Sequence, residues 1–238
     1  MSVFQDLYDA HLTIAGHAIT WREILGNAFG LASAVGGMRR RVWAWPVGIV
    51  GNVLLFTVFF FTAAQTDHGG QPLYGQAGRQ IFFIVVSIYG WIRWRQTQRA
   101  GGAGAFAVVP RWATARERTT FLVASGVGVL VAYAAFRAIG AGFPVTHWWY
   151  YWADAWIFVG SMVATYAMAR GWVDFWLCWL AVDIVGVPEL LYFRFYPSAV
   201  LYGVYGAFVI WGFVAWLRIA QAESASMAVP ARPDEVPA

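Results

Sequence analysis

Two carboxylates and a proline interrupt an apolar stretch, LAVDIVGVPELLYF, at residues 180–193. The acids are Asp183 and Glu189, and Pro188 stands directly before the second one. A soluble core rarely buries unpaired acids. A lipid-facing helix excludes them, because an ionised Asp at the centre of a membrane helix costs about 2.5–3.5 kcal/mol. Asp183 is therefore a candidate substrate contact, and a structural hydrogen bond between helices is the alternative.

Two tryptophans precede Asp183 in the sequence and would lie near it on a helix. Trp179 and Asp183 are four residues apart, so they share one face of a helix, and Trp176 lies about one turn earlier. For Glu189 two interpretations have equal weight. It is either an interfacial carboxylate near Arg194 or part of a gate with Pro188, which can kink the helix.

The composition places these residues in a polytopic membrane protein. The chain has 238 residues, of which 60% are hydrophobic and 12% charged, and its mean hydropathy is +0.56. Soluble domains carry about 25% charged residues. No cleavable signal peptide is visible, and the single Cys178 cannot form an intrachain disulfide. Seven apolar stretches are long enough to cross a bilayer: 23–38, 43–64, 74–94, 119–139, 153–169, 172–193 and 196–217.

The basic residues are unevenly distributed between the loops. All 16 are arginine. The side that is reached after the first, third, fifth and seventh stretches carries Arg39, Arg40, Arg41, Arg93, Arg95, Arg99, Arg111, Arg116, Arg118, Arg170, Arg218 and Arg232. The other side carries Arg22, Arg79, Arg137 and Arg194. The positive-inside rule then predicts an outer N-terminus and a cytoplasmic C-terminus. Because these arginines flank spans, nucleic acid is not an expected partner.

Two parts of the chain repeat one another. At a constant offset of 122, Tyr74, Ala77, Gly90 and Trp94 match Tyr196, Ala199, Gly212 and Trp216. At an offset of 130, Gly30, Met38 and Arg40 match Gly160, Met168 and Arg170, and the second and sixth stretches both open with paired tryptophans. Three helices plus one linker helix bring both halves into the membrane from the same side. The pattern predicts a parallel repeat with the substrate site between the halves near the midplane.

The expected architecture is all-α, with seven transmembrane helices in a 3+1+3 arrangement. We expect an N-terminal segment at 1–22, a first three-helix bundle at 23–94 and a second at 153–218. Residues 95–152 then form a basic cytoplasmic loop, the linker helix and an outer loop, and 219–238 form a disordered tail.

Several enzyme classes do not fit the sequence. The chain has no lysine, which excludes a Walker A motif. Its histidines show no metal-ligand spacing and fall outside the expected spans: His11, His17, His68 and His147. We expect no metal, no cofactor and no catalytic residue. A membrane-embedded enzyme and a sensory or structural membrane protein remain as alternatives from other classes.

The segments WPVGIVGN, LYGQAGRQIFF with IYGWIRW, and WLCWLAVD resemble the Pnu family of bacterial vitamin transporters. The similarity runs from Trp21 to Arg218. The resemblance implies a fold like the SWEET sugar transporters, with two three-helix bundles and a linker helix, in the bacterial cytoplasmic membrane. It also implies facilitated diffusion with alternating access, in which intracellular phosphorylation traps the product. The oligomeric state stays open, and the resemblance favours a homotrimer.

The resemblance also assigns site residues. The family's substrate-binding Asn, Gln and Trp pair fall on Asn52, Gln80, Trp176 and Trp179. Asp183 stands where the nicotinamide riboside branch has Asn, and the chain is most similar to the riboflavin branch. Riboflavin is therefore the expected substrate, and nicotinamide riboside and thiamine are the alternatives. The full candidate set is Trp45, Asn52, Gln76, Gln80, Trp176, Trp179, Asp183, Tyr202 and Tyr205, with Pro188 and Glu189 as gating residues.

Overall fold

The computed structural model describes residues 10–14, 17–61, 74–102, 105–140, 148–192 and 196–228. Seven helices occupy most of this part of the chain. They are α2 (Trp21–Met38), α3 (Ala44–Phe61), α4 (Tyr74–Ala100), α5 (Ala115–Ile139), α6 (Tyr150–Ala169), α7 (Asp174–Tyr192) and α8 (Tyr196–Ala228). Their positions agree with the seven apolar stretches of the sequence.

The fold is all-α as expected, with a short β-hairpin before the helices that the sequence did not indicate. Strand β1 (His11–Ile14) pairs antiparallel with β2 (His17–Thr20), so that His11 lies opposite Thr20. The hairpin leads directly into α2, because Thr20 caps that helix by accepting a hydrogen bond from the Glu23 amide at 3.3 Å. The segment expected at 1–22 is therefore partly a strand pair, and residues 1–9 lie outside the described part.

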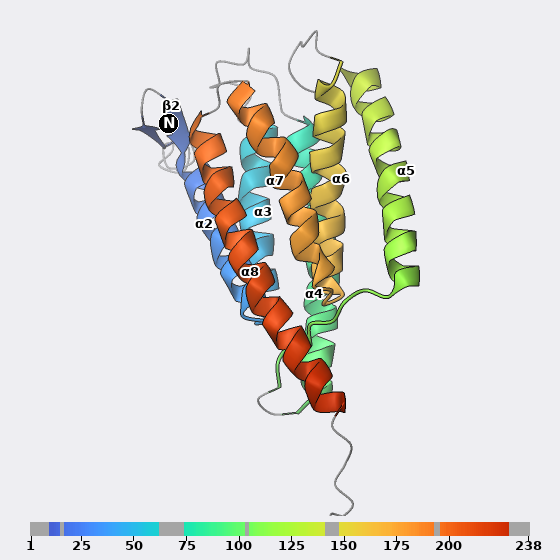
Figure 1. The fold of residues 1–238 in the computed structure, drawn as a ribbon. Coiled ribbons are helices and arrows are strands. Elements are labelled where there is room, and N and C mark those ends of the chain that lie inside the picture. Colours follow the sequence, from blue (N-terminus) through green and yellow to red (C-terminus); the bar gives the residue numbers. More distant parts are fainter. Residues whose placement is uncertain are drawn as a thin grey trace, which may run out of the picture.

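The helices form a bundle in which neighbours in sequence are mostly neighbours in space. Helix α3 packs against α2 and α4, and α7 packs against α6 and α8. The two groups meet where α4 packs against α6 and where α8 approaches α2. Helix α5 packs against α6 at one edge of the bundle (Figure 1). Apolar side chains on its outer side are exposed: Leu122 is 69% exposed and Val131 is 62% exposed. An apolar helix face this open suits lipid better than water.

Several helix boundaries differ from the sequence expectation. Helix α4 continues to Ala100, so the first residues of the loop expected from residue 95 are helical. Helix α5 begins at Ala115 because Thr114 and Glu117 form a capping box, in which each side chain bonds the other residue's backbone amide. Helix α8 continues to Ala228 and projects past the other helices (Figure 1), so residues 219–228 are helical where an irregular tail was expected. Residues 229–238 of that expected tail lie outside the described part.

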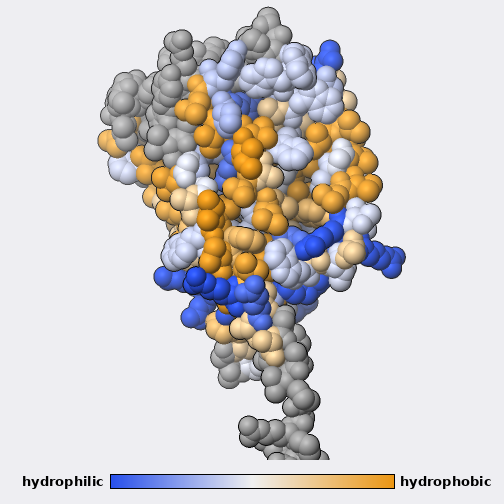
Figure 2. All heavy atoms as spheres, in the orientation of Figure 1, coloured by the Kyte–Doolittle hydropathy of each residue, from blue (hydrophilic) through white to orange (hydrophobic). Residues whose placement is uncertain are grey.

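Apolarity and length alone single out only some of the helices as membrane spans. Among the described residues, Ala115–Ile139 and Tyr202–Glu223 are long and apolar enough, and Ala44–Phe60 is a shorter apolar helix. Helix α4 carries charged residues within its length, such as Arg79 and Arg93. Figure 2 shows a broad apolar surface around the middle of the molecule, with hydrophilic residues gathered below it.

The arginine-rich side of the sequence becomes one end of the bundle, where a structured connection crosses the helix ends. Residues 105–114, here called the 105–114 segment, bond to both groups of helices. The Ala107 amide donates to the Arg40 carbonyl at 3.4 Å, and the Arg111 amide donates to the Gly171 carbonyl at 3.1 Å. Gly171 has a positive φ of 73°, which favours glycine at this close approach. The expected loop is therefore ordered and joins the two groups of helices.

Ion pairs hold the 105–114 segment in place. Arg111 makes two hydrogen bonds to Glu117, at 2.7 and 2.8 Å, and Arg170 reaches the same carboxylate at 3.3 Å. The hydrogen bonds from Arg111, followed by the one from the Thr114 amide, keep the pKa of Glu117 well below its usual range. Arg118 pairs with Asp174 at 2.7 Å, and Asp174 also accepts from the Ala113 amide at 2.8 Å. The segment is therefore attached to the starts of α5 and α7.

Candidate functional site

Asp183 lies on the face of α7 that looks toward α8. A methyl group placed on Gly206 of α8 would lie 3.5 Å from Asp183 Oδ2, so the glycine leaves room for the carboxylate. Asp183 Oδ2 is buried and has no hydrogen-bond partner among the described residues. A buried acceptor without a donor costs free energy, and a bound molecule with N–H or O–H groups would remove that cost.

Trp176 sits closer to the arginine-rich end on the same helix and is 3% exposed. Its ring covers Gly212 of α8 so tightly that a Cβ there would overlap it. The ring also meets Trp216 edge-on, at 6.2 Å between centroids. The Trp176 indole nitrogen is buried without a partner in the described part of the chain. Trp179 is partly buried and packs against the same cluster.

The first group of helices contains the same arrangement. Trp45 of α3 is 3% exposed and covers Gly90 of α4, where a Cβ would lie 2.5 Å from its ring. It meets Trp94 edge-on at 5.2 Å. The Trp45 indole nitrogen is also buried without a partner within the described residues. The repeat of Gly90 with Gly212 and of Trp94 with Trp216 thus corresponds to the same packing in both halves, with Trp45 and Trp176 as equivalents.

The remaining candidates occupy the same two groups of helices. Asn52 is partly exposed on α3, eight residues after the helix begins at Ala44, and Asp183 is nine residues after α7 begins at Asp174. The rise of an α-helix places both about 12–14 Å along their helices. Gln80 of α4 is 3% exposed, and its Oε1 has no partner among the described residues.

Two tyrosines of α8 complete the set. Tyr202 packs on Gly186 of α7, 3.0 Å from where a Cβ would stand, and Tyr205 is partly buried. The side chain of Gln76 lies outside the described part, as do Arg194, Arg232, His68 and His147.

The structure therefore brings the candidates together in two groups. Asp183, Trp176 and Tyr202 lie along the α7–α8 contact, and Trp45 lies on the α3–α4 contact. The groups meet at the arginine-rich end, where Trp94 and Trp216 are 6.4 Å apart and the Trp216 indole donates to the Met38 carbonyl at 2.9 Å. Several buried polar atoms around these contacts have no hydrogen-bond partner among the described residues, which is typical of a site for a polar, aromatic ligand. No group of three metal-ligating side chains occurs among the described residues.

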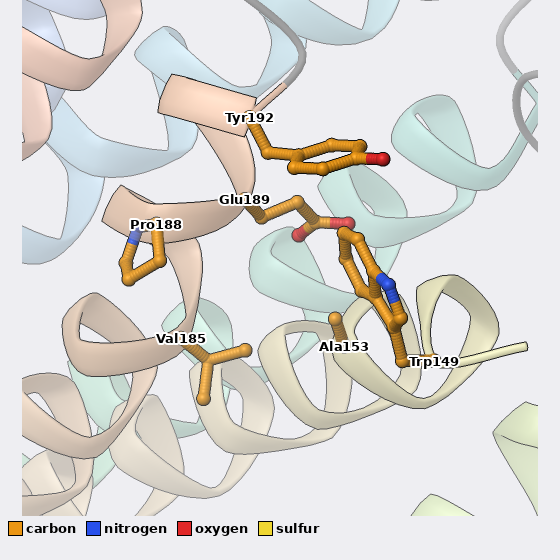
Figure 3. A pocket seen from close by; sticks show the side chains of 6 residues that line it. All are labelled: Trp149, Ala153, Val185, Pro188, Glu189 and Tyr192. Atoms are coloured by element: carbon orange, nitrogen blue, oxygen red, sulfur yellow. The ribbon is translucent and has the colours of Figure 1, made fainter. Parts of the chain in front are cut away.

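One feature was not found by sequence reasoning. A pocket of about 300 Å³ lies between α6 and α7, near the end opposite the arginines (Figure 3). Of its residues, only Pro188 and Glu189 were singled out from the sequence. The available signal was the spacing of Val185, Pro188, Glu189 and Tyr192, which puts them on one helix face.

Comparison with known proteins decides the family. A model of the nicotinamide mononucleotide transporter family matches residues 20–218. The chain belongs to this family. The Pnu-family resemblance seen in the sequence is thereby confirmed, and the protein is a membrane protein.

Two curated members extend this relation. The riboflavin/roseoflavin transporter RibM of Streptomyces davaonensis is 37% identical over 210 residues, covering 88% of this chain and 87% of that protein. The nicotinamide riboside transporter PnuC of Escherichia coli is 23% identical over 232 residues, covering 87% of this chain and 89% of that protein. Both relatives are named as transporters, which favours transport over catalysis for this member of the family.

A solved structure supports the fold. The crystal structure of the vitamin B3 transporter PnuC superposes with a TM-score of 0.64 at 20% identity, covering 85% of this chain and 83% of that one. The helical bundle described above therefore shares its fold with that structure.

Proposed function

We propose that this family member carries riboflavin across the bacterial cytoplasmic membrane by facilitated diffusion. The observation that carries the proposal is the 37% identity to a riboflavin/roseoflavin transporter over nearly the whole of both chains. The N-terminus lies outside and the C-terminus in the cytoplasm, because the arginine-rich end is the one held inside by the positive-inside rule. A homotrimer is the assembly that the family resemblance favours.

The chemistry of the candidate site suits this substrate. Riboflavin joins a flat isoalloxazine ring to a ribityl chain with several hydroxyl groups. The tryptophans of the two halves offer aromatic surface to the ring. Asp183 Oδ2 and Gln80 Oε1 are buried acceptors without partners in the described part of the chain, and they can accept from a hydroxyl or from the flavin imide. Asn52, Gln76, Trp179, Tyr202 and Tyr205 complete the proposed site.

The proposed mechanism is alternating access between two three-helix bundles. Helices α2–α4 form one bundle, α6–α8 form the other, and α5 links them in a 3+1+3, SWEET-like arrangement. The matched Trp–Gly contacts support treating each bundle as a rigid unit. The bundles rock around a midplane site, and cytosolic phosphorylation traps the product because a mostly apolar path accommodates a charged phosphate poorly. Pro188 and Glu189 belong to the outer gate.

Nicotinamide riboside is the second candidate substrate. It is supported by the 23% identity to a nicotinamide riboside transporter. Asp183 argues for riboflavin over this substrate, because the nicotinamide riboside branch has Asn at this position. Nicotinamide riboside carries a cationic ring, as thiamine does, and a cation would give Asp183 a counter-charge.

The experiment that tests the proposal is exchange in liposomes. Purified protein is reconstituted and tested with labelled riboflavin, nicotinamide riboside and thiamine, with protein-free liposomes as the control. We expect saturable riboflavin exchange and saturable quenching of tryptophan fluorescence by riboflavin. Exchange of another vitamin without riboflavin exchange would overturn the substrate assignment. No saturable flux of any of the three would favour a sensory or structural role.

A further inference from the structure

The pocket between α6 and α7 has the composition of a ligand site. Its walls are the rings of Trp149 and Tyr192, whose centroids are 5.2 Å apart at an interplanar angle of 85°. Ala153, Val185 and Pro188 supply apolar surface, and Glu189 supplies the carboxylate (Figure 3). A volume of about 300 Å³ is at the lower end of small-molecule sites, enough for a ring system.

The carboxylate in the pocket favours a ligand with a hydrogen-bond donor. Glu189 Oε1 is buried and has no hydrogen-bond partner among the described residues. Asp154 of α6 interacts electrostatically with Glu189 and also with Arg79 of α4, so a cation partly balances this pair of acids. The pocket is therefore rich in acceptors. A ligand with an N–H donor would satisfy Glu189, whereas a phosphate group offers mainly acceptors and would not.

The pocket and the proposed central site use different faces of α7. Val185, Pro188, Glu189 and Tyr192 share the face that meets α6. Asp183 looks toward Gly206 of α8 instead. A change in one set of residues therefore leaves the other set in place, and the two sites can be tested separately.

We propose that this pocket is an outer binding site for a flat heteroaromatic ring with an N–H donor, which packs against the edge-to-face pair of Trp149 and Tyr192 and which Glu189 fixes by a hydrogen bond. The inference rests on the proposed function, and the ligand is then the isoalloxazine of unphosphorylated riboflavin. The site binds the substrate at the outer end before it reaches the residues around Asp183. Its acceptors reject phosphorylated flavin.

The test measures occupancy of the pocket directly. In a Cys178→Ala background, Ala153→Cys places a thiol on the pocket floor, and its alkylation by a maleimide is timed in detergent. We expect riboflavin to slow alkylation in a saturable manner and riboflavin 5′-phosphate to have little effect. The matched control is Ala138→Cys, an exposed position near the outer end of α5, which should react at the same rate with or without riboflavin.

Second substitutions identify the residues responsible. Adding Glu189→Gln should weaken protection roughly ten-fold or more, the loss expected for a hydrogen bond to a charged group. Trp149→Ala should also weaken it, whereas Trp149→Phe keeps an aromatic wall and should retain it. Asp183→Ala should leave protection intact. Each variant is accepted only if it remains monodisperse.

The outcomes separate this inference from the proposed function. Riboflavin exchange in liposomes without any protection of the Ala153→Cys thiol overturns the outer site and leaves the transport assignment standing. Equal protection by the phosphate ester, or full protection in Glu189→Gln, also overturns it. Protection without riboflavin exchange supports the pocket and removes riboflavin as the transported substrate.

Discussion

The packing of Trp176 on Gly212 leads to a sharp prediction about Gly212→Ala. A Cβ at this position would overlap the far edge of the Trp176 ring, a distance that real structures do not show. Trp176 is 3% exposed and enclosed by Phe175, Phe208 and Trp216, with ring centroids 4.3, 6.0 and 6.2 Å away. The ring cannot move aside without displacing these neighbours. Overpacking of this kind typically costs about 1–3 kcal/mol.

A Gly→Ala change also stabilises a helix through its higher helix propensity, which opposes the destabilising overlap. A second Gly→Ala variant on the same helix corrects for this gain. A Gly→Ala change in a helix interior gains about 0.8–1 kcal/mol when the methyl group meets nothing. Gly203 of α8 is such a position, because nothing lies within 4 Å of its would-be Cβ. The propensity gain is common to both variants, so the difference between Gly203→Ala and Gly212→Ala isolates the overlap with Trp176, about 1–3 kcal/mol.

The assay is thermal unfolding of purified variants in one detergent. For a protein of this size, about 1 kcal/mol shifts Tm by roughly 2–4 °C. We expect Gly212→Ala to unfold about 2–12 °C below Gly203→Ala. The Tm of Gly90→Ala should lie below that of its own control, Gly78→Ala, by a similar amount. A Cβ at Gly90 would stand 2.5 Å from the Trp45 ring, whereas a Cβ at Gly78 would have no atom within 4 Å. Equal Tm values within each pair would refute the packing argument.

Three further predictions concern the site, the topology and the arginine-rich end. Asp183→Ala should weaken riboflavin binding roughly ten- to hundred-fold by calorimetry, and Asp183→Asn less, because the amide keeps one acceptor; unchanged binding in a folded variant makes Asp183 structural. Ala100→Cys, in a Cys178→Ala background, should resist an impermeant maleimide in intact cells, and ready labelling would reverse the topology. The pKa of Glu117 is lower in the folded protein than in the unfolded chain, where it is about 4.3. The ionised carboxylate therefore stabilises the fold at pH values above about 4.3, and this stabilisation is lost progressively at lower pH. Glu117→Gln should therefore lower Tm at pH 7, and the difference from the parent should shrink only in strong acid; a difference that does not depend on pH contradicts this assignment.

The positions of the helices could be predicted because apolar length is a local property of the sequence. Seven apolar stretches became α2 to α8 among the described residues, with shifts mainly at the ends. The start of α5 could have been found as well, since Thr114 and Glu117 have the spacing of a capping box. The extension of α8 through QAESASMA was missed because the segment is polar, although Ala, Glu, Gln and Met favour helices.

The candidate site was only partly readable from the sequence. The repeat indicated that Gly90 and Gly212 are equivalent, but not that each accommodates a tryptophan from the preceding helix. That pairing depends on how α3 turns toward α4 and α7 toward α8, which is a tertiary property. The pocket at Glu189 was missed for the same reason, because Trp149 and Ala153 come from another helix. The roles of Asn52, Gln80 and Asp183 in binding stay predictions.

The contacts within the halves differ in kind from the contacts between them, and this difference bears on how the protein could move. Within each half, a tryptophan is fitted against a glycine, as Trp45 is on Gly90, so little sliding is allowed. Between the halves at the arginine-rich end, Trp94 and Trp216 stand 6.4 Å apart, and one indole hydrogen bond joins Trp216 to Met38. The 105–114 segment adds three backbone bonds: the Ala107 amide donates to Arg40 on one side, and on the other side Arg111 donates to Gly171 and accepts from the Val173 amide. If the halves rock as rigid units, these polar bonds must break, each worth only about 0.5–1.5 kcal/mol. The packing of α4 against α6, which includes the stacked rings of Tyr89 and Tyr166, must shift as well. The glycines that receive tryptophan rings therefore stiffen the halves, and the cost of moving one half against the other is set by the α4–α6 contact together with the bonds at the helix ends.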